Sequence, residues 1–132
     1  MPSLDHVTLV VSDYARSKTF YEKALAPLGI KPIMDFGQAC GFGRDGKPDF
    51  WIGSGPASFH RPEHLEIITP THVAFAAQSR AEVEAFHKAA LAAGAKDFGA
   101  PGVRAHYHPN YYAAFVLDPD GHDIEAVYHG GR

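Results

Sequence analysis

The stretch FVLDPDGHDIEAVYH, residues 115–129, is predicted to form a strand, a tight turn and a second strand. Residues 118–121, DPDG, are typical of a turn, because proline presets φ and glycine adopts a positive φ without steric cost. Side chains alternate along the second strand, so Glu125 shares a face with Asp123 and Val127. A carboxylate is costly to bury without a partner, so we expect Glu125 to face water, a cation or a metal.

Two histidines stand in other strand-like, apolar segments and offer partners for this carboxylate. His6 lies in LDHVTLVV, residues 4–11, and His72 lies in THVAFAA, residues 71–77, which is 66 positions later. The same spacing separates four further identical pairs: Val7 and Val73, Phe20 and Phe86, Ala24 and Ala90, and Leu25 and Leu91. Chance similarity is the alternative, but five identities at one spacing favour an internal repeat.

Each half is predicted to contain a strand, a helix and three further strands. In the first half these span residues 4–11, 14–28, 31–36, 39–43 and 49–53, and a connector follows. In the second half they span residues 71–77, a helix from a capping box at Ser79 and Glu82 to about 93, and strands from 96–100, 111–117 and 123–128. The offset between the halves grows to 75 at the Asp-Gly turns, which places an enlarged loop at 99–110. Inserted loops often lie on the binding side of a repeated scaffold.

These segments resemble the vicinal-oxygen-chelate superfamily, which holds glyoxalases, extradiol dioxygenases, fosfomycin-resistance thiol transferases and bleomycin-binding proteins. The resemblance covers nearly the whole chain and rests on LDHVTLVV, FYEKALAPLGI, THVAFAA and DPDGHDIEAV. It implies an α+β fold in which two βαβββ modules form an open barrel-like cup around a divalent metal. We expect one domain over 1–132, with modules at about 1–54 and 70–132 and a connector at 55–69.

Composition narrows the classes of partner. The chain has 132 residues, a net charge of −3 and no basic run, so neither nucleic acid nor an acidic membrane is the expected partner. Its single cysteine, Cys40, excludes an intrachain disulfide. No apolar run approaches the roughly 20 residues of a membrane span, and the first residues do not resemble a signal peptide. We therefore expect a cytoplasmic protein that binds a small molecule.

The candidate metal ligands are His6, His72 and Glu125. Two imidazoles and one carboxylate suit Zn, Mn, Fe, Ni or Co and leave coordination positions open. A lone histidine in a strand is more often a hydrogen-bonded core residue. Two histidines at matching positions, together with the carboxylate, favour one divalent metal ion instead. The resemblance implies the same three ligands, because each matches a ligand position of the superfamily.

Trp51 and Thr8 are candidate neighbours of the metal. Aligning residues 49–51 on 123–125 places Trp51 at the fourth ligand position of glyoxalase-like members. The indole N–H is only a donor, so Trp51 cannot bind the metal and is expected to form an aromatic wall of the pocket or to pack in the core. Thr8 shares a strand face with His6 and is a candidate catalytic residue that hydrogen-bonds a metal-bound oxygen. Its other interpretation is a plain strand former.

The segment RAHYHPNYY, residues 104–112, is dense in polar and aromatic side chains. Arg104 is predicted to hold an anionic substrate, and His108 and Tyr112 are further candidates for substrate binding. Tyr111 is a candidate acid or base, along with its histidine and tyrosine neighbours. The alternative is a solvated loop.

We predict a glyoxalase-like, metal-dependent enzyme of lyase or isomerase type that acts on an oxygen-chelating metabolite. The alternatives are an extradiol-type dioxygenase, a metal-free drug-sequestering protein of the bleomycin-resistance type, and a thiol transferase of the fosfomycin-resistance type. The sequence continues only to Arg132 after Glu125, without a longer basic tail, which favours the thiol transferase least. A homodimer is expected, because each module exposes a sheet edge and an apolar face.

Overall fold

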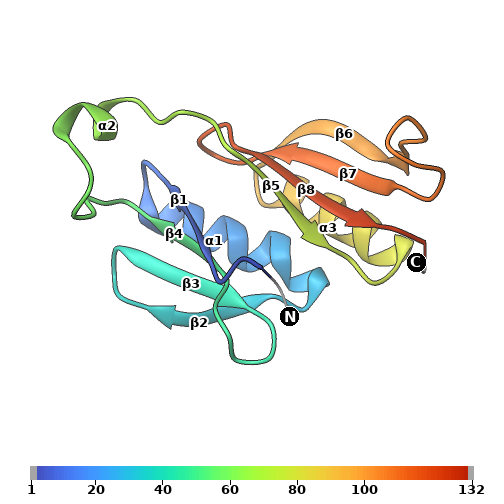
Figure 1. The fold of residues 1–132 in the computed structure, drawn as a ribbon, viewed down its shortest axis with the longest axis horizontal. Helices are drawn as coiled ribbons and strands as arrows, with labels where there is room; N and C mark the ends of the chain where they lie inside the picture. The colour runs from blue at the N-terminus through green and yellow to red at the C-terminus, as the bar shows by residue number, and fades with distance from the viewer. Residues whose placement is uncertain (1–2, 131–132) are drawn as a thin grey trace.

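The computed structural model describes residues 3–130, apart from the side chains of residues 65 and 66. The outermost positions of the expected domain, 1–2 and 131–132, therefore lie outside the described residues. The chain forms two similar halves, which we name module 1 and module 2, joined by a connector (Figure 1). Each module has a strand, a helix and three more strands, so the predicted α+β fold of two βαβββ modules is confirmed.

The elements follow the predicted order. Module 1 contains β1 (Val7–Val10), α1 (Tyr14–Leu25), a 3-10 turn (Ala26–Leu28), β2 (Lys31–Asp35), β3 (Ala39–Gly43) and β4 (Phe50–Gly53). Module 2 contains β5 (His72–Ala76), α3 (Arg80–Ala92), β6 (Lys96–Val103), β7 (Tyr112–Leu117) and β8 (Asp123–Tyr128). The connector holds one short helix, α2 (Pro62–Glu66).

The two sheets have the same topology. Their strand orders are β1-β4-β3-β2 and β5-β8-β7-β6, and in each the first pair is parallel while the other pairs are antiparallel. Thr8 lies opposite Trp51 in module 1, and Ala74 lies opposite Glu125 in module 2. Because Ala74 follows Thr8 by the repeat distance of 66, Trp51 and Glu125 occupy equivalent positions.

Side-chain caps fix where the two long helices begin. The Asp13 carboxylate accepts from the backbone N–H of Arg16, and the Ser79 hydroxyl accepts from that of Glu82. Each cap satisfies an N–H group that has no partner inside its helix. In the predicted capping box the Glu82 carboxylate would accept from the N–H of Ser79. It accepts instead from the N–H of Gln78, the residue before the N-cap.

Two predicted boundaries are wrong. The segment predicted as an enlarged loop from residue 99 is partly strand, because β6 continues to Val103 and pairs with β7 through register shifts around Gly99. The loop proper is therefore 104–111. At the other end of the chain β1 begins at Val7, and His6 stands just before it. Leu4, expected in a buried strand, is 76% exposed.

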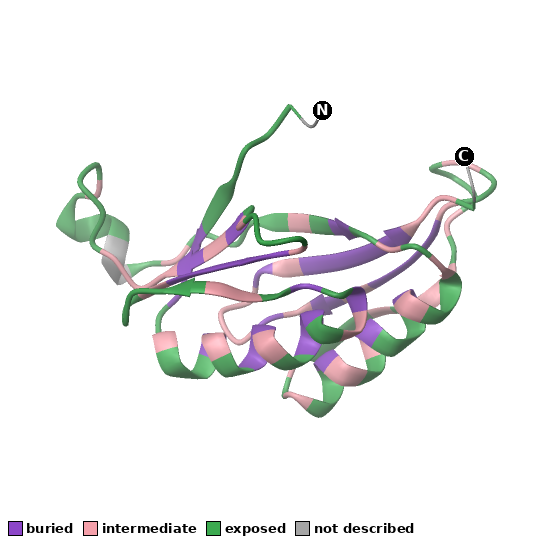
Figure 2. Ribbon diagram, turned by 90° about the horizontal axis from the view of Figure 1, so that it is seen from below, coloured by how far each residue is buried: buried purple, intermediate pink, exposed green. Residues whose placement is uncertain are grey.

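The helices α1 and α3 contact each other and lie on the same face of the two sheets (Figure 2). Ile52 and Ile124 belong to the buried core on this face. Because side chains alternate along a strand, Trp51 and Glu125 lie on the opposite, helix-free face. The core is continuous across the modules, since the rings of Phe50 and Phe75 meet edge to face at 5.0 Å.

Within residues 3–130 the structure contains no helix that is both long and apolar enough to cross a membrane.

Candidate metal centre

Glu125 is the centre of the best-formed polar cluster on the helix-free face. Its side chain is only 2% exposed. One carboxylate oxygen, Oε2, accepts from the Tyr111 hydroxyl at 2.5 Å, and the other, Oε1, lies 3.1 Å from Nε2 of His72. The carboxylate is therefore buried with a phenol and an imidazole as partners, which offsets the cost of removing it from water.

His72, the first residue of β5, is held in one orientation. Its Nδ1 lies 3.0 Å from the carbonyl oxygen of Asp123 and 3.1 Å from the carboxylate of the same residue. The ring also stacks on Phe115, with the centroids 6.3 Å apart. Since Nδ1 faces two acceptors, it carries a proton, and Nε2 is directed at Glu125. A proton or a metal cation between Nε2 and the carboxylate satisfies both groups.

Asp123, which holds His72, has a second carboxylate oxygen in the interior of the protein. Among the described residues, its Oδ1 atom is buried and accepts no hydrogen bond. A buried acceptor of this kind indicates an ordered water or a cation that completes the site. One imidazole nitrogen and the carboxylate of Glu125 are ligand types that zinc, manganese and iron use, whereas Asp123 faces the other imidazole nitrogen, Nδ1, and orients the ring. The residues around Glu125 thus fit a divalent metal.

His6 shows the same pattern in module 1. Its Nδ1 lies 2.7 Å from a carboxylate oxygen of Asp5, which also lies 3.2 Å from the ammonium group of Lys47. The hydrogen bond from His6, followed by the contacts with Lys47, lowers the pKa of Asp5 below its usual value. A histidine held through Nδ1 by a carboxylate presents Nε2, as metal-binding histidines commonly do.

The two histidines do not meet within one chain. β1 and β5 face each other across the middle of the molecule and run in opposite directions (Figure 1). His6, at the start of β1, lines the same groove as Ala76 at the end of β5. The described part of the chain contains no group of three His, Cys, Asp or Glu side chains able to hold a metal. The set of His6, His72 and Glu125 therefore stays a prediction, and a single chain does not assemble it.

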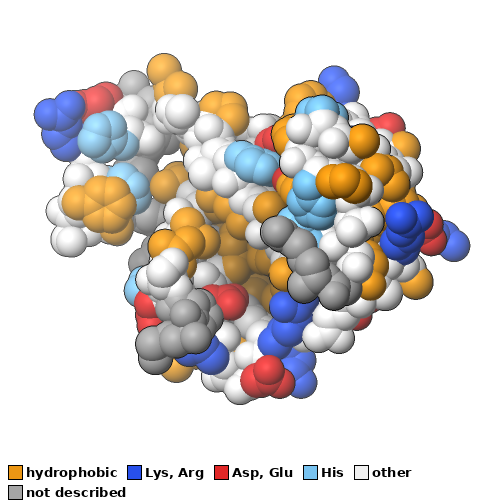
Figure 3. All heavy atoms as spheres, turned by 45° about the vertical axis from the view of Figure 1, so that its right-hand side comes forward, with side chains coloured by type: hydrophobic (Ala, Val, Ile, Leu, Met, Phe, Trp, Pro, Cys, Tyr) orange, Lys and Arg blue, Asp and Glu red, His pale blue; other side chains and the backbone are white. Residues whose placement is uncertain are grey.

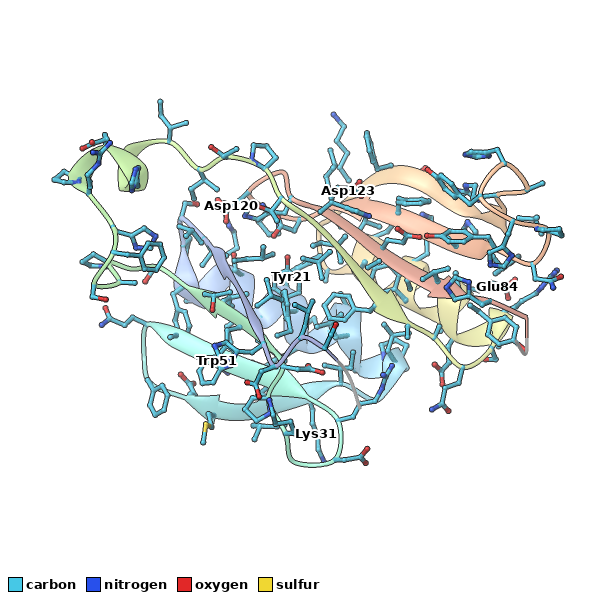
Figure 4. All side chains as sticks on the ribbon, in the orientation of Figure 1. Tyr21, Lys31, Trp51, Glu84, Asp120 and Asp123 are labelled. Atoms are coloured by element: carbon cyan, nitrogen blue, oxygen red, sulfur yellow. The ribbon has the colours of Figure 1, made fainter. Side chains whose placement is uncertain are left out.

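Trp51 and Thr8 lie with His6 in a pocket of about 330 Å³ on module 1. The remaining lining residues are Asp5, Lys47 and Pro48. Trp51 therefore forms a pocket wall rather than part of the core. Figure 4 shows Trp51 on the sheet of module 1 and Asp123 on the sheet of module 2, so this pocket and the cluster around Glu125 lie in different modules.

The loop before β7 contributes Tyr111 to the site but not Tyr112. Burial, together with the hydrogen bond to Glu125, raises the pKa of Tyr111. Tyr112 was predicted to bind substrate, and that role stays a prediction: its hydroxyl donates to Glu84 on α3 at 2.6 Å, and Arg80 lies over its ring. Successive residues of a strand point to opposite faces, which directs Tyr112 to the helices.

Arg104, the first residue of this loop, has its partners nearby. The guanidinium of Arg104 donates to the carbonyls of Gly102 and Ala100 and lies 5.3 Å from the ring centroid of Phe115. Its predicted role in holding an anion stays a prediction.

His108 reaches a residue that sequence reasoning missed. The His108 Nε2 atom lies 2.7 Å from Nδ1 of His129, and both rings contact Tyr111 edge-on. The signal for His129 was present, because it stands four positions after Glu125 and so shares its strand face.

A groove of about 520 Å³ separates the modules. Its floor and walls include hydrophobic residues of both modules, namely Val7, Ile30, Phe50, Val73 and Phe75. Figure 3 shows an apolar hollow in the middle of the surface, with charged side chains near its rim. The free edges of β1 and β5 border this groove.

The model of the Glyoxalase/Bleomycin resistance protein/Dioxygenase superfamily matches residues 3–126. The chain therefore belongs to this superfamily, and the resemblance seen in its sequence is confirmed. A comparison with curated proteins finds no match.

Solved structures agree with this assignment. A glyoxalase/bleomycin resistance protein from Albidiferax ferrireducens T118 is 30% identical, with a TM-score of 0.78 over 96% of this chain and 98% of that one. A lactoylglutathione lyase from Agrobacterium tumefaciens is 20% identical, with a TM-score of 0.68 over 98% and 96%. A glyoxalase/bleomycin resistance protein/dioxygenase family enzyme from Burkholderia phytofirmans PsJN is 19% identical, with a TM-score of 0.66 over 97% and 99%. The last two likenesses show the fold alone.

Proposed function

We propose that the chain is a metal-dependent enzyme of lyase or isomerase type that acts on a small metabolite binding through two oxygens. The observation that carries this proposal is the buried cluster around Glu125. There a carboxylate accepts from Tyr111 and faces Nε2 of His72, whose Nδ1 lies against the carboxylate of Asp123. A cup that only sequesters an apolar drug has no need of such a cluster. The cytoplasmic location inferred from the sequence is part of the proposal.

The metal centre forms between two copies of the chain, with His6 from one copy and His72 and Glu125 from the other. The strands β1 and β5 face each other at the boundary between the modules, which we name the seam. The placement of the two histidines at opposite ends of this seam supports the arrangement. Each chain then carries two half-sites, which a two-fold symmetric partner completes. The apolar groove and the free edges of β1 and β5 are the surfaces that a second copy covers.

A bound divalent metal supplies a Lewis acid that stabilises negative charge on a substrate oxygen. The protein residues act around it. Tyr111 keeps its proton on the phenol oxygen, because burial and the contact with Glu125 raise its pKa. It therefore holds Glu125 in place and can donate a hydrogen bond to an oxyanion that displaces the carboxylate. Phe115 stacks on His72 and limits the rotation of the imidazole.

A metal-free binding protein of the bleomycin-resistance type is the second candidate. The observation in its favour is the largely apolar groove of about 520 Å³ between the modules. The two candidates differ in their response to a chelator. If the chain is a metal-dependent enzyme, removing the metal abolishes turnover. If it is a binding protein, removing the metal leaves the binding of an apolar drug in the groove unchanged.

The test is calorimetric titration of Zn²⁺ into chelator-treated protein, with Glu125→Gln as the variant. We expect one ion per chain and a loss of affinity of more than about 100-fold in the variant, because a ligand matters more than the outer partners whose loss costs 10–100-fold. Glu84→Gln is the matched control, since Glu84 also accepts from a tyrosine hydroxyl but belongs to α3, on the other side of the sheet from Glu125. Equal affinity in wild type and Glu125→Gln contradicts the proposal.

A further inference from the structure

The segment that carries His6 lies outside the sheet of module 1. β1 begins at Val7, and the residues just before it extend away from both sheets (Figure 2). The side chain of His6 is 55% exposed and that of Asp5 is 74% exposed. Packing therefore does little to fix the direction in which the His6 imidazole points.

Lys47, in the turn between β3 and β4, holds this segment. Its ammonium nitrogen lies 3.1 Å from the carbonyl oxygen of Asp5 and 3.2 Å from a carboxylate oxygen of the same residue. That carboxylate oxygen also lies 2.7 Å from Nδ1 of His6. Among the described residues, the contacts of Lys47 are the only side-chain hydrogen bonds and ion pairs that join residues 4–6 to the rest of the chain.

The ammonium group of Lys47 is fully used by the protein. It carries three N–H groups, and its third neighbour is the carbonyl oxygen of Pro48 at 3.2 Å. The backbone of Lys47 is also held close to β3, because a Cβ atom added at Gly43 would lie 1.9 Å from the carbonyl oxygen of Lys47. Lys47 thus serves as an anchor for Asp5 and keeps no donor for a substrate.

Module 2 orients its histidine from a different place. There Nδ1 of His72 faces Asp123, the residue opposite it on the interior strand β8. The equivalent of Asp123 in module 1 is Asp49, but Nδ1 of His6 faces Asp5 instead. The anchored carboxylate, and not the one across the sheet, therefore sets the orientation of the His6 imidazole.

We propose that Lys47 is a positioning residue for His6, which it orients by holding the carboxylate of Asp5 against Nδ1 of the imidazole. Nδ1 then carries the proton, and Nε2 keeps its lone pair for a ligand. The consequence for a metal rests on the proposed function, whereas the orientation of the imidazole does not. Because exposed ion pairs add little to stability, the contact matters for the imidazole and not for the fold.

Imidazole ¹⁵N spectra of metal-free protein at pH 8 test this orientation, because the ring nitrogens have different chemical shifts in the two neutral tautomers. The His6 signals are assigned by their absence in His6→Ala. We expect the wild type to hold the Nδ1–H form and Lys47→Met to move His6 away from it. Lys47→Arg keeps the charge and the donors and should retain the wild-type signals.

Lys23→Met is the matched control, since it makes the same change at an exposed position of α1 and should leave the His6 signals as they are in the wild type. Urea denaturation should give the same midpoint for Lys23→Met and Lys47→Met, which separates the spectral change from unfolding. Unchanged His6 signals in Lys47→Met, or an equal change in Lys47→Arg, would overturn the proposal.

Zn²⁺ titration separates this inference from the proposed function. The Zn²⁺ affinity of Lys47→Met is expected to fall about 10-fold, the lower end of the loss seen for outer partners of histidine ligands. His6 signals that depend on Lys47 in a protein that binds no Zn²⁺ support the positioning role and contradict the metal centre. Tight Zn²⁺ binding together with unchanged His6 signals in Lys47→Met supports the metal centre and contradicts the positioning role.

Discussion

The imidazole of His122 joins the two modules at one end of their seam. Its Nδ1 accepts from the backbone N–H of Thr71 at 2.9 Å, and its Nε2 donates to the carbonyl of Val10, the last residue of β1, at 2.9 Å. The side chain is 1% exposed. A buried imidazole with both nitrogens satisfied fixes the end of β1 against the start of β5 and β8.

Replacing His122 by alanine is expected to destabilise the protein by about 1–3 kcal/mol, because a backbone donor and a backbone acceptor lose their partner in a buried place. Urea denaturation measures the change. His106→Ala is the control, since His106 is exposed in the loop before β7 and its loss is expected to stay within about 0.5 kcal/mol. Similar losses in the two variants would show that His122 does not hold the modules together.

Tyr21 and Asp118 form a second buried link, with the Tyr21 hydroxyl donating to the carboxylate at 2.5 Å. Burial, with the nearby Asp118, raises the pKa of Tyr21 well above its usual value. The phenol therefore stabilises the folded state fully below the unfolded pKa of 10.0, and this contribution is lost as pH rises toward the folded pKa.

The difference in unfolding free energy between wild type and Tyr21→Phe should thus be constant up to about pH 9 and then shrink by about 1.4 kcal/mol per pH unit above pH 10. Urea denaturation at pH 8, 9.5 and 11 measures it. The other tyrosines are present in both proteins, so their effect on the unfolding free energy cancels when the two proteins are compared at the same pH. A difference that is unchanged at pH 11 contradicts the raised pKa of Tyr21.

Gly41→Ala is expected to move Trp51, because the new methyl group would lie 2.7 Å from the indole. Overpacking of this kind costs about 1–3 kcal/mol. The emission of the single tryptophan should shift, and stability should fall by that amount. Gly53→Ala on β4 is the control, since its methyl group would meet no atom closer than 3.7 Å. Unchanged emission in Gly41→Ala would show that the indole does not rest on this glycine.

Asp123→Asn tests the hydrogen bonding that orients His72. The asparagine keeps the size of the side chain but removes the charge that faces Nδ1 of the imidazole. Metal affinity measured by Zn²⁺ titration should fall by about 10–100-fold, as it does for outer partners of histidine ligands. Asp45→Asn, in a turn where asparagine also tolerates a positive φ, should leave the affinity unchanged. An unchanged Zn²⁺ affinity in Asp123→Asn would show that Asp123 does not contribute to the metal centre.

Much of the fold was predictable from the sequence, because it depends on local signals that occur twice. The 66-position repeat predicted both modules, and the cap at Ser79 marked the start of the second long helix. The continuation of β6 to Val103 was not predictable in this way. Its residues 99–103, GAPGV, carry glycine and proline, and only pairing with β7 makes them a strand.

The candidate site was predictable only within each module. Strand alternation placed Glu125 correctly on the face opposite the core, and the repeat aligned it with Trp51. How module 1 is set against module 2 depends on contacts distant in sequence, such as that between His122 and Val10. Nothing in the sequence therefore predicts that His6 and His72 lie at opposite ends of the seam.

The most direct test of a metal centre shared between two copies is to mix His6→Ala and Glu125→Gln proteins after subunit exchange and to titrate Zn²⁺. Each variant alone lacks one ligand in every site. In a mixed dimer, His6 of the Glu125→Gln chain meets His72 and Glu125 of the His6→Ala chain, which restores one complete site. We predict that tight binding returns at about a quarter of all sites, as random pairing of two-fold symmetric subunits requires. A mixture that binds no more Zn²⁺ than the two variants separately would contradict the account.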